Sequence, residues 1–157
     1  MSDCNLDMAE TIARLPGLGS LPPDRLHALA SMASLESIQE GQTFYREDEQ
    51  GLDIYYLVSG LVEGRMRIPS SGHDDSFRVL KSGSWFGETS FLDGGRRGST
   101  LAARERSLVV RLDGTALRTA CERDPVLGRA VYAALGRVAA MRVRDTALEL
   151  RNAVGSY

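Results

Sequence analysis

Lysine, cysteine and histidine are scarce in this chain. Its 157 residues include one lysine (Lys81), two cysteines (Cys4 and Cys121) and two histidines (His27 and His73). The cysteines are too few and too far apart for a disulfide framework, and the cysteine and histidine spacing does not match a zinc site. We therefore expect no metal site and no cofactor.

The chain also lacks a surplus of positive charge and a long apolar run. Lysine and arginine number 19 against 21 acidic residues, for a formal net charge of −2. Because a duplex-DNA binder usually carries a basic surplus, we expect no direct DNA binding by this chain. No apolar run approaches the ~20 residues of a membrane span, and the N-terminus does not have the layout of a signal peptide. We expect a cytoplasmic protein without a membrane partner.

Glycine, by contrast, is plentiful. Sixteen glycines against five prolines indicate many tight turns, because glycine adopts positive φ without steric cost. Between residues 35 and 112, short β-compatible segments are separated by glycine or polar turns, which favours an antiparallel roll, barrel or sandwich. The predicted strands cover about residues 35–39, 43–46, 54–58, 62–68, 76–80, 99–104 and 108–112.

Helical patterns flank the predicted strands on both sides. The N-terminal region 1–34 contains two of them, 7–14 and a second that begins at Pro22-Pro23 and runs to about Ser34. The C-terminal region 113–154 also contains two. Asp113 suits the N-cap of a short helix to about Arg123, and Asp124-Pro125 is typical of the start of the longer one. Its apolar residues recur at intervals of three, four or seven, at Leu127, Val131, Ala134, Val138, Met141 and Leu148. We interpret residues 1–157 as one domain, mainly β with flanking helices.

The segment from Phe86 to Thr100 carries the most chemical information. A strand is expected to end at Phe86. Gly87 then allows the backbone to turn and to approach a ligand closely, and Glu88 to Leu92 have the length of one helical turn. The free N–H groups at the start of such a turn favour an anion. An Asp-Gly-Gly turn then reverses the chain and brings Arg97 back, where its guanidinium can grip a phosphate in bidentate fashion.

Glu88 does not suit a phosphate, because like charges repel. An ionised carboxylate only accepts hydrogen bonds, so it suits a sugar hydroxyl next to that phosphate. The segment therefore indicates a nucleotide whose phosphate lies close to its ribose. From the residues alone, two other roles stay open: Glu88 as a helix-start carboxylate, and a direct Glu88–Arg97 ion pair.

This stretch resembles the phosphate-binding cassette of cyclic-nucleotide-binding domains. The family cassette begins Phe-Gly-Glu and has its arginine about nine residues later, as Glu88 and Arg97 do here. The resemblance extends to the strand-to-glycine signature between Ile54 and Gly60, and to the turns at Gly41 and Gly83. It implies a jelly-roll-like antiparallel β-roll with N-terminal helices and C-terminal lid helices. It also implies a regulatory domain and not an enzyme, in agreement with the missing nucleophile–base pair.

By the same resemblance, Glu88 would bind the ribose 2′-hydroxyl and Arg97 the cyclic phosphate. Phe77, on the strand facing the cassette, would contact the base. The residues expected to line the sugar and phosphate, mostly through backbone groups, are Gly87, Thr89, Ser90, Gly98 and Ser99. Gly98 lacks the threonine hydroxyl that cGMP-responsive members often use there, which favours cAMP over cGMP as the ligand. Thr89 departs from the apolar residue that is usual at its position.

The long C-terminal helix is expected to act as a lid that reports ligand binding to an unknown protein effector. Candidates to reach the base from this helix are Arg129, Tyr132 and Arg137. Its apolar seam is compatible with pairing in a homodimer and equally with packing on the roll. Two alternative functions remain open: a ligand-free structural or dimerisation module of the same fold, and a fragment of a cAMP-receptor-type transcription factor or of a larger effector. The transcription-factor alternative requires a helix-turn-helix after the lid helix.

Overall fold

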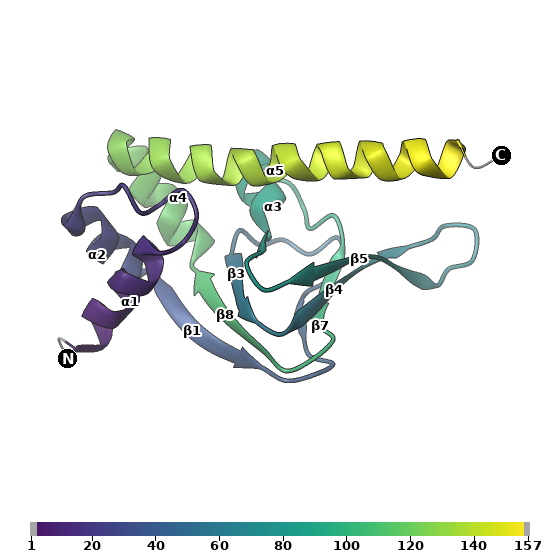
Figure 1. Cartoon of the computed structure of the whole chain (residues 1–157), viewed down its shortest axis with the longest axis horizontal. Coiled ribbons are helices and arrows are strands. Elements are labelled where there is room, and N and C mark those ends of the chain that lie inside the picture. The colour runs from purple at the N-terminus through teal and green to yellow at the C-terminus, as the bar shows by residue number, and fades with distance from the viewer. Residues whose placement is uncertain (1–2, 156–157) are drawn as a thin grey trace.

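The computed structural model describes the backbone of residues 3–155 and the side chains of residues 8–155 (Figure 1). The helices are α1 (Asp3–Ala13), α2 (Pro23–Ser31), α3 (Glu88–Asp93), α4 (Gly114–Arg123) and α5 (Pro125–Val154). The strands are β1 (Ala33–Ile38), β2 (Thr43–Tyr45), β3 (Ile54–Ser59), β4 (Leu61–Arg67), β5 (Asp74–Lys81), β6 (Trp85–Phe86), β7 (Thr100–Ala103) and β8 (Ser107–Leu112). The side chain of Cys4 lies outside the described residues.

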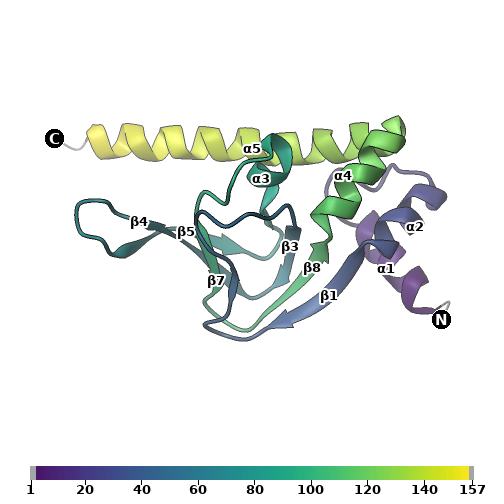
Figure 2. The ribbon, with the colours of Figure 1, turned by 180° about the vertical axis from the view of Figure 1, so that it is seen from behind.

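The strands form two four-stranded antiparallel sheets that face each other. Their orders are β1-β8-β3-β6 and β2-β7-β4-β5, so most neighbours come from distant parts of the sequence, whereas β4 and β5 are consecutive strands. In Figures 1 and 2 the two sheets curve around a common interior, with α1, α2 and α4 gathered at one end and α5 lying across the top. The predicted antiparallel β-roll with flanking helices is confirmed.

Two apolar cores hold the fold together, one on each face of the β1-β8-β3-β6 sheet. The core inside the roll consists of Tyr55, Leu57, Val62, Leu80, Phe86, Leu101 and Val109. The core under the helices joins Ile54, Trp85 and Leu112 of the sheet to residues of α1, α2, α4 and α5. Successive strand side chains point to opposite faces, so Trp85 enters the helical core and Phe86 the roll. This double anchoring fixes the backbone just before Gly87.

Helices α4 and α5 begin at side-chain caps that the sequence indicates. Asp113 accepts from the N–H of Ala116 at 2.9 Å, and Asp124 accepts from the N–H of Val126 at 3.1 Å and of Leu127 at 3.3 Å. Such caps replace the hydrogen bonds that the first helical N–H groups lack. Although α5 is 30 residues long, no helix in the described part of the chain is both long and apolar enough to cross a bilayer.

The predicted apolar seam of α5 divides into two halves. Leu127, Val131, Ala134 and Val138 are buried in the helical core, whereas Met141 is 55% exposed and Leu148 is 47% exposed. Val138 is the last buried residue of the helix. The first half of the seam therefore packs on the body of the domain, and homodimer formation stays a prediction.

Among the boundaries that differ from the predicted ones, the end of α2 has a clear physical cause. Helix α2 ends at Ser31 and not at Ser34, because Ala33 already pairs with Leu112 in the β1–β8 ladder. The strand that the sequence predicts to end at Phe86 is the two-residue β6. It is too short to show an alternation of apolar and polar residues, and its pairing with β3 alone defines it.

Candidate functional site

The turn after β6 requires glycine. Gly87 has φ of +84°, in the left-handed region, and precedes the first residue of α3. A Cβ atom on Gly87 would lie 2.6 Å from the carbonyl oxygen of Asp53, closer than carbon and oxygen can approach. The glycine therefore lets the start of α3 pack directly against the beginning of β3.

A second turn returns the chain from α3 to the same place. Gly94, with φ of +72°, ends α3, and the N–H of Gly95 donates to the Asp93 side chain at 2.7 Å. The backbone of Arg97 is then held on both sides: its N–H donates to the carbonyl of Glu49 at 2.9 Å, and its carbonyl accepts from Asp48 at 2.8 Å. The predicted reversal that brings Arg97 back to α3 is confirmed.

The guanidinium of Arg97 is buried and is held by carbonyl groups. Its Nη1 donates to the carbonyl of Gly87 at 3.1 Å and its Nη2 to the carbonyl of Asp53 at 2.8 Å. The residue is 3% exposed, and its Nε has no hydrogen-bond partner. Among the side chains that the structure describes, no carboxylate lies within ion-pair distance of Arg97. A buried charge without a counter-ion is costly, so this geometry favours an anion as partner.

An aromatic ring supports Arg97 from one side. The guanidinium carbon lies 4.0 Å from the centroid of the Tyr45 ring, a cation–π distance. Burial raises the pKa of the Tyr45 phenol well above its ordinary value, although Arg97 opposes that shift. The ring consequently stays neutral at any ordinary pH and offers its π face but no counter-charge.

Glu88 is equally buried but has a cationic partner. It is 1% exposed, and its carboxylate oxygens lie 3.0 and 3.1 Å from Nη1 of Arg142 on α5. Nη2 of Arg142 also donates to the carbonyl of Trp85. The direct Glu88–Arg97 pair that the sequence left open is therefore not formed. Instead, Arg142 joins the lid helix to the cassette, which we define as residues 86–100.

A cavity of about 250 Å³ opens between the cassette, the second sheet and α5. Each residue predicted to contact the ligand lines it: Phe77, Gly87, Glu88, Thr89, Ser90, Arg97, Gly98 and Ser99. Larger hollows of about 590 and 800 Å³ lie elsewhere along α5, but neither contains a cassette residue. Phe77 is 45% exposed at the rim. The structure thus brings the predicted residues together, and their roles toward a ligand remain predictions.

The lining also includes residues that the sequence analysis missed. Tyr45, Arg142 and Thr146 face this cavity, and Nη2 of Arg78 donates to the Thr146 hydroxyl at 3.0 Å across its edge. These residues come from β2, β5 and α5, far from the cassette in sequence, and no local motif marks them.

The residues of α5 that the sequence analysis suggested for contact with the base do not line the cavity. Tyr132 packs on Phe91 of α3, with ring centroids 5.5 Å apart, and does not line the cavity. Arg129 and Arg137 lie along the groove beside residues 17–22 instead. Helix α5 reaches the cavity further along, at Arg142 and Thr146, because its first half is occupied by the helical core.

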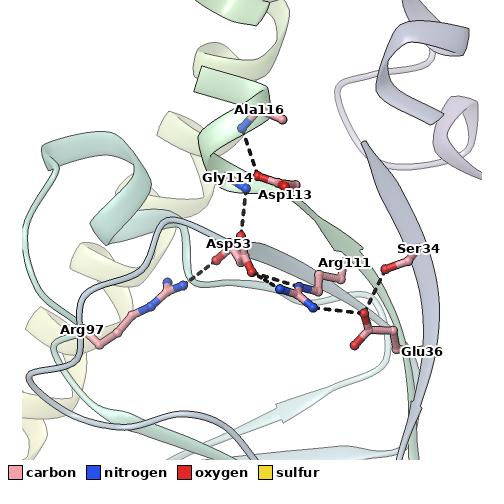
Figure 3. A network of polar contacts seen from close by, with 8 residues as sticks. All are labelled: Ser34, Glu36, Asp53, Arg97, Arg111, Asp113, Gly114 and Ala116. Carbon is pink, nitrogen blue, oxygen red and sulfur yellow. Dashed lines mark hydrogen bonds and ion pairs between the residues drawn. The ribbon is translucent and has the colours of Figure 1, made fainter. Parts of the chain in front are cut away.

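Behind Arg97, Asp53 connects the site to α4 (Figure 3). While its carbonyl accepts from Arg97, its carboxylate accepts from Arg111 Nε at 2.9 Å and from the backbone N–H of Gly114 at 2.9 Å. The same carboxylate raises the pKa of Arg111 above its ordinary value through their hydrogen bonds. One residue thus contacts both the buried guanidinium and the first residue of α4.

Residues 35–124 match the cyclic nucleotide-binding domain family. The chain belongs to this family. This cyclic nucleotide-binding domain is 28% identical over 139 residues to the CRP-like cAMP-activated global transcriptional regulator of Mycobacterium tuberculosis, covering 88% of the chain and 60% of the regulator. It is 27% identical over 101 residues to the cAMP-dependent protein kinase regulatory subunit of Blastocladiella emersonii, covering 64% of the chain and 25% of that subunit.

The fold comparison agrees with the sequence comparison. A cyclic nucleotide-binding domain from Methylobacillus flagellatus superimposes with a TM-score of 0.74 at 20% identity, over 90% of this chain and 79% of that one. The domain spans at most 60% of the length of the two curated relatives named above. Both are regulatory proteins by name, so the family is one of regulatory ligand-binding domains.

Proposed function

We propose that this domain binds a cyclic nucleoside monophosphate, cAMP in preference to cGMP, and transmits binding through helix α5. The observation that carries the proposal is the guanidinium of Arg97, buried at the edge of the cavity without a carboxylate partner. The cyclic phosphate would supply the missing negative charge. Charge-assisted bonds of this kind are about twice as strong as neutral hydrogen bonds.

Glu88 would hold the ribose, and Arg142 would report that event. In the structure the Glu88 carboxylate is engaged by Arg142 at 3.0 Å. A ribose 2′-hydroxyl donating to Glu88 would share or displace that contact. Either outcome changes the hold of α5 on the cassette, so ligand binding and the position of the lid become coupled through one side chain.

Two observations support cAMP over cGMP. Gly98 has no side chain to offer a hydroxyl to a guanine, and no atom lies within 4 Å of the point where its Cβ would be. The transcriptional regulator is named for activation by cAMP, and the kinase subunit for dependence on it. We accordingly expect Gly98→Thr to fit sterically and to shift preference toward cGMP, about tenfold in the ratio of the two dissociation constants.

The ligand-free alternative is less favoured by the geometry of Arg97. An empty structural module would need a Glu88–Arg97 pair or another anion to neutralise the buried guanidinium. The hydrogen-bond acceptors of Arg97 in the described residues are carbonyl groups, and its Nε has no hydrogen-bond partner. A cytoplasmic location, a homodimer and an attached effector remain proposals, as does the absence of catalysis and of direct DNA binding.

Calorimetric titration of the whole chain with cAMP, cGMP, adenosine and 5′-AMP tests the proposal. We expect cAMP to bind and adenosine to bind weakly, and Arg97→Ala to weaken cAMP binding by about 100-fold. Arg96→Ala is the matched control, because Arg96 is exposed, donates to the carbonyl of Asp48 and does not line the cavity. Undiminished affinity in Arg97→Ala would overturn the assigned site.

The coupling through Glu88 has its own test. The 2′-deoxy form of cAMP retains the phosphate but lacks the hydroxyl that would reach Glu88. We expect it to bind about tenfold to a hundredfold more weakly than cAMP and to leave hydrogen exchange in α5 unchanged, whereas cAMP alters it. Equal effects of the two nucleotides on α5 would refute a signal passing from Glu88 to Arg142.

A further inference from the structure

The second half of α5 carries an apolar stripe that packs against nothing in the described part of the chain. Burial ends at Val138, although the helix continues to Val154 and projects past the roll (Figures 1 and 2). Three large apolar side chains here are among the most exposed of the molecule: Val143 at 70%, Leu150 at 64% and Val154 at 67%. Exposed apolar side chains at regular spacing indicate an interaction surface.

These residues belong to a heptad pattern distinct from the buried seam. We define the outer seam as the residues spaced four and three apart along the solvent side of α5: Gly136, Ala140, Val143, Ala147, Leu150 and Val154. Each lies two positions after a residue of the buried seam or its continuation. At 100° per residue, two positions turn the helix by about 200°, so the outer seam faces away from the body. An alternation of four and three residues is the pattern of helix-on-helix packing.

A row of arginines borders the outer seam on one side. Arg137, Arg144 and Arg151 follow the seam at seven-residue intervals, each directly after Gly136, Val143 or Leu150. In heptad terms they occupy the e positions, while the g positions hold Ala139, Thr146 and Ala153. No ion pair is formed by these arginines with any described residue.

This charge arrangement does not suit a second copy of the chain. In a parallel pair, each e arginine would face an uncharged g residue of the other copy. In an antiparallel pair, the arginine rows would face each other and repel. Acidic residues on the facing edge of another helix would complement the row.

We propose that the outer seam of α5 docks an amphipathic helix of another protein, with an apolar seam of its own bordered by glutamate or aspartate. The proposal builds on the signalling role proposed for α5, because it names the class of partner that would receive the signal. The narrow seam favours a helix over a membrane surface, which takes a broad apolar face.

The test uses two synthetic helical peptides of four heptads, identical in their apolar positions. One carries glutamate at every e and g position and the other carries lysine, so each repels itself and stays monomeric at neutral pH. Fluorescence anisotropy of the labelled peptides, titrated with the whole chain, gives both affinities. We expect the glutamate peptide to bind about tenfold or more tightly than the lysine peptide, and the difference to shrink at high salt.

Charge reversal provides the decisive variant. Arg144→Glu with Arg151→Glu should invert the preference toward the lysine peptide, whereas the same change at Arg67 and Arg104, exposed on the roll, should leave it unchanged. Val143→Asp should abolish binding of either peptide. Equal binding of the two peptides, or a preference that survives charge reversal, would overturn the proposal.

Two further measurements separate this proposal from self-association of the chain and from the proposed nucleotide binding. If sedimentation velocity shows a dimer that Leu150→Glu dissociates, the seam serves self-association and the acidic partner is refuted. Calorimetry with cAMP on the Arg144→Glu/Arg151→Glu variant should match the wild type, because neither residue lines the cavity. If the wild-type chain binds cAMP but neither peptide, the docking surface alone is refuted. If it binds the glutamate peptide but not cAMP, the proposed ligand alone is refuted.

Discussion

Two arginines face the same cavity, Arg97 from the cassette and Arg142 from α5, and they are held in opposite ways. Arg97 is 3% exposed, is clamped through its own backbone, and has carbonyl and aromatic partners but no carboxylate. The Arg142 side chain is 25% exposed and is paired with Glu88. The cassette thus presents a buried arginine without a carboxylate partner, whereas α5 presents a partly exposed arginine that is paired with Glu88.

This contrast teaches where rigidity lies in the domain. The cassette is fixed by backbone geometry, in particular by Gly87 and Gly94 at positive φ between paired strands. The lid is fixed over the site by a few side-chain contacts, because its buried half ends at Val138. Substitutions in the cassette should therefore cost stability through the backbone, and substitutions in the lid mainly through single contacts.

The largest effect is expected at Gly87. Gly87→Ala places a Cβ 2.6 Å from the carbonyl of Asp53 and forces alanine into the left-handed region. We expect a loss of about 3 kcal/mol in the free energy of unfolding, measured by urea denaturation, and loss of nucleotide binding. Gly98→Ala is the control within the same cassette, because its Cβ would meet no atom within 4 Å. Similar losses in the two variants would contradict a rigid turn specific to Gly87.

The next largest effect is a difference in stability loss between substitutions of the two partners of the Glu88–Arg142 ion pair. Arg142→Ala leaves a carboxylate that is 1% exposed with only the Thr89 hydroxyl nearby, and should cost about 2 kcal/mol. Glu88→Gln frees a side chain that can turn toward water, and should cost about 1 kcal/mol. Urea denaturation of both variants measures the difference. A greater loss for Glu88→Gln would show that Arg142 is the more constrained partner.

A smaller change, of opposite sign, is expected in the lid. Gly136 lies within α5, and a Cβ there would meet no atom within 4 Å. Gly136→Ala should raise the free energy of unfolding by about 0.5–1 kcal/mol, because alanine loses less backbone entropy in a helix. Thermal denaturation is sufficient to detect it. Destabilisation would mean that α5 is packed at this turn by something other than its own domain.

The smallest effect belongs to the contact at the edge of the cavity. Thr146→Val removes the hydroxyl that accepts from Arg78 at 3.0 Å on an exposed surface. We expect a stability change below about 0.5 kcal/mol and a change in cAMP affinity of less than about threefold. A large loss of affinity, measured by calorimetry, would make Thr146 a direct ligand contact and move the base-binding role from Phe77 to the lid.

The difference between Arg97 and Arg142 also explains what the sequence could predict. Glu88 and Arg97 are joined by a short segment with its own turn glycines, so their proximity is a local property that spacing reveals. Arg142 lies 54 residues from Glu88, and their contact depends on how α5 crosses the roll. The apolar seam continues past Val138 to Met141 and Leu148, with Asp145 interrupting it, so the pattern does not indicate that the helix leaves the core at Val138.

The same reasoning applies to the fold. Glycine turns between short β-compatible segments predicted an antiparallel roll, barrel or sandwich and most of its strands, and the family resemblance selected the roll. Asp113 and Asp124 marked the starts of α4 and α5. The end of α2 was missed, because a partner far along the chain, Leu112, pairs with Ala33 and decides it. Tyr45 was likewise unmarked, since its role arises only when β2 lies beside the returning cassette.

The chain's single tryptophan lies where the cassette and α5 meet. Trp85 is 4% exposed in the helical core, its carbonyl accepts from Arg142, and its ring lies 5.1 Å from that of Tyr56. Any displacement of Arg142 alters the electric field around this indole. The molecule consequently contains an intrinsic fluorescent probe, and we expect a ligand that displaces Arg142 to change the emission of Trp85.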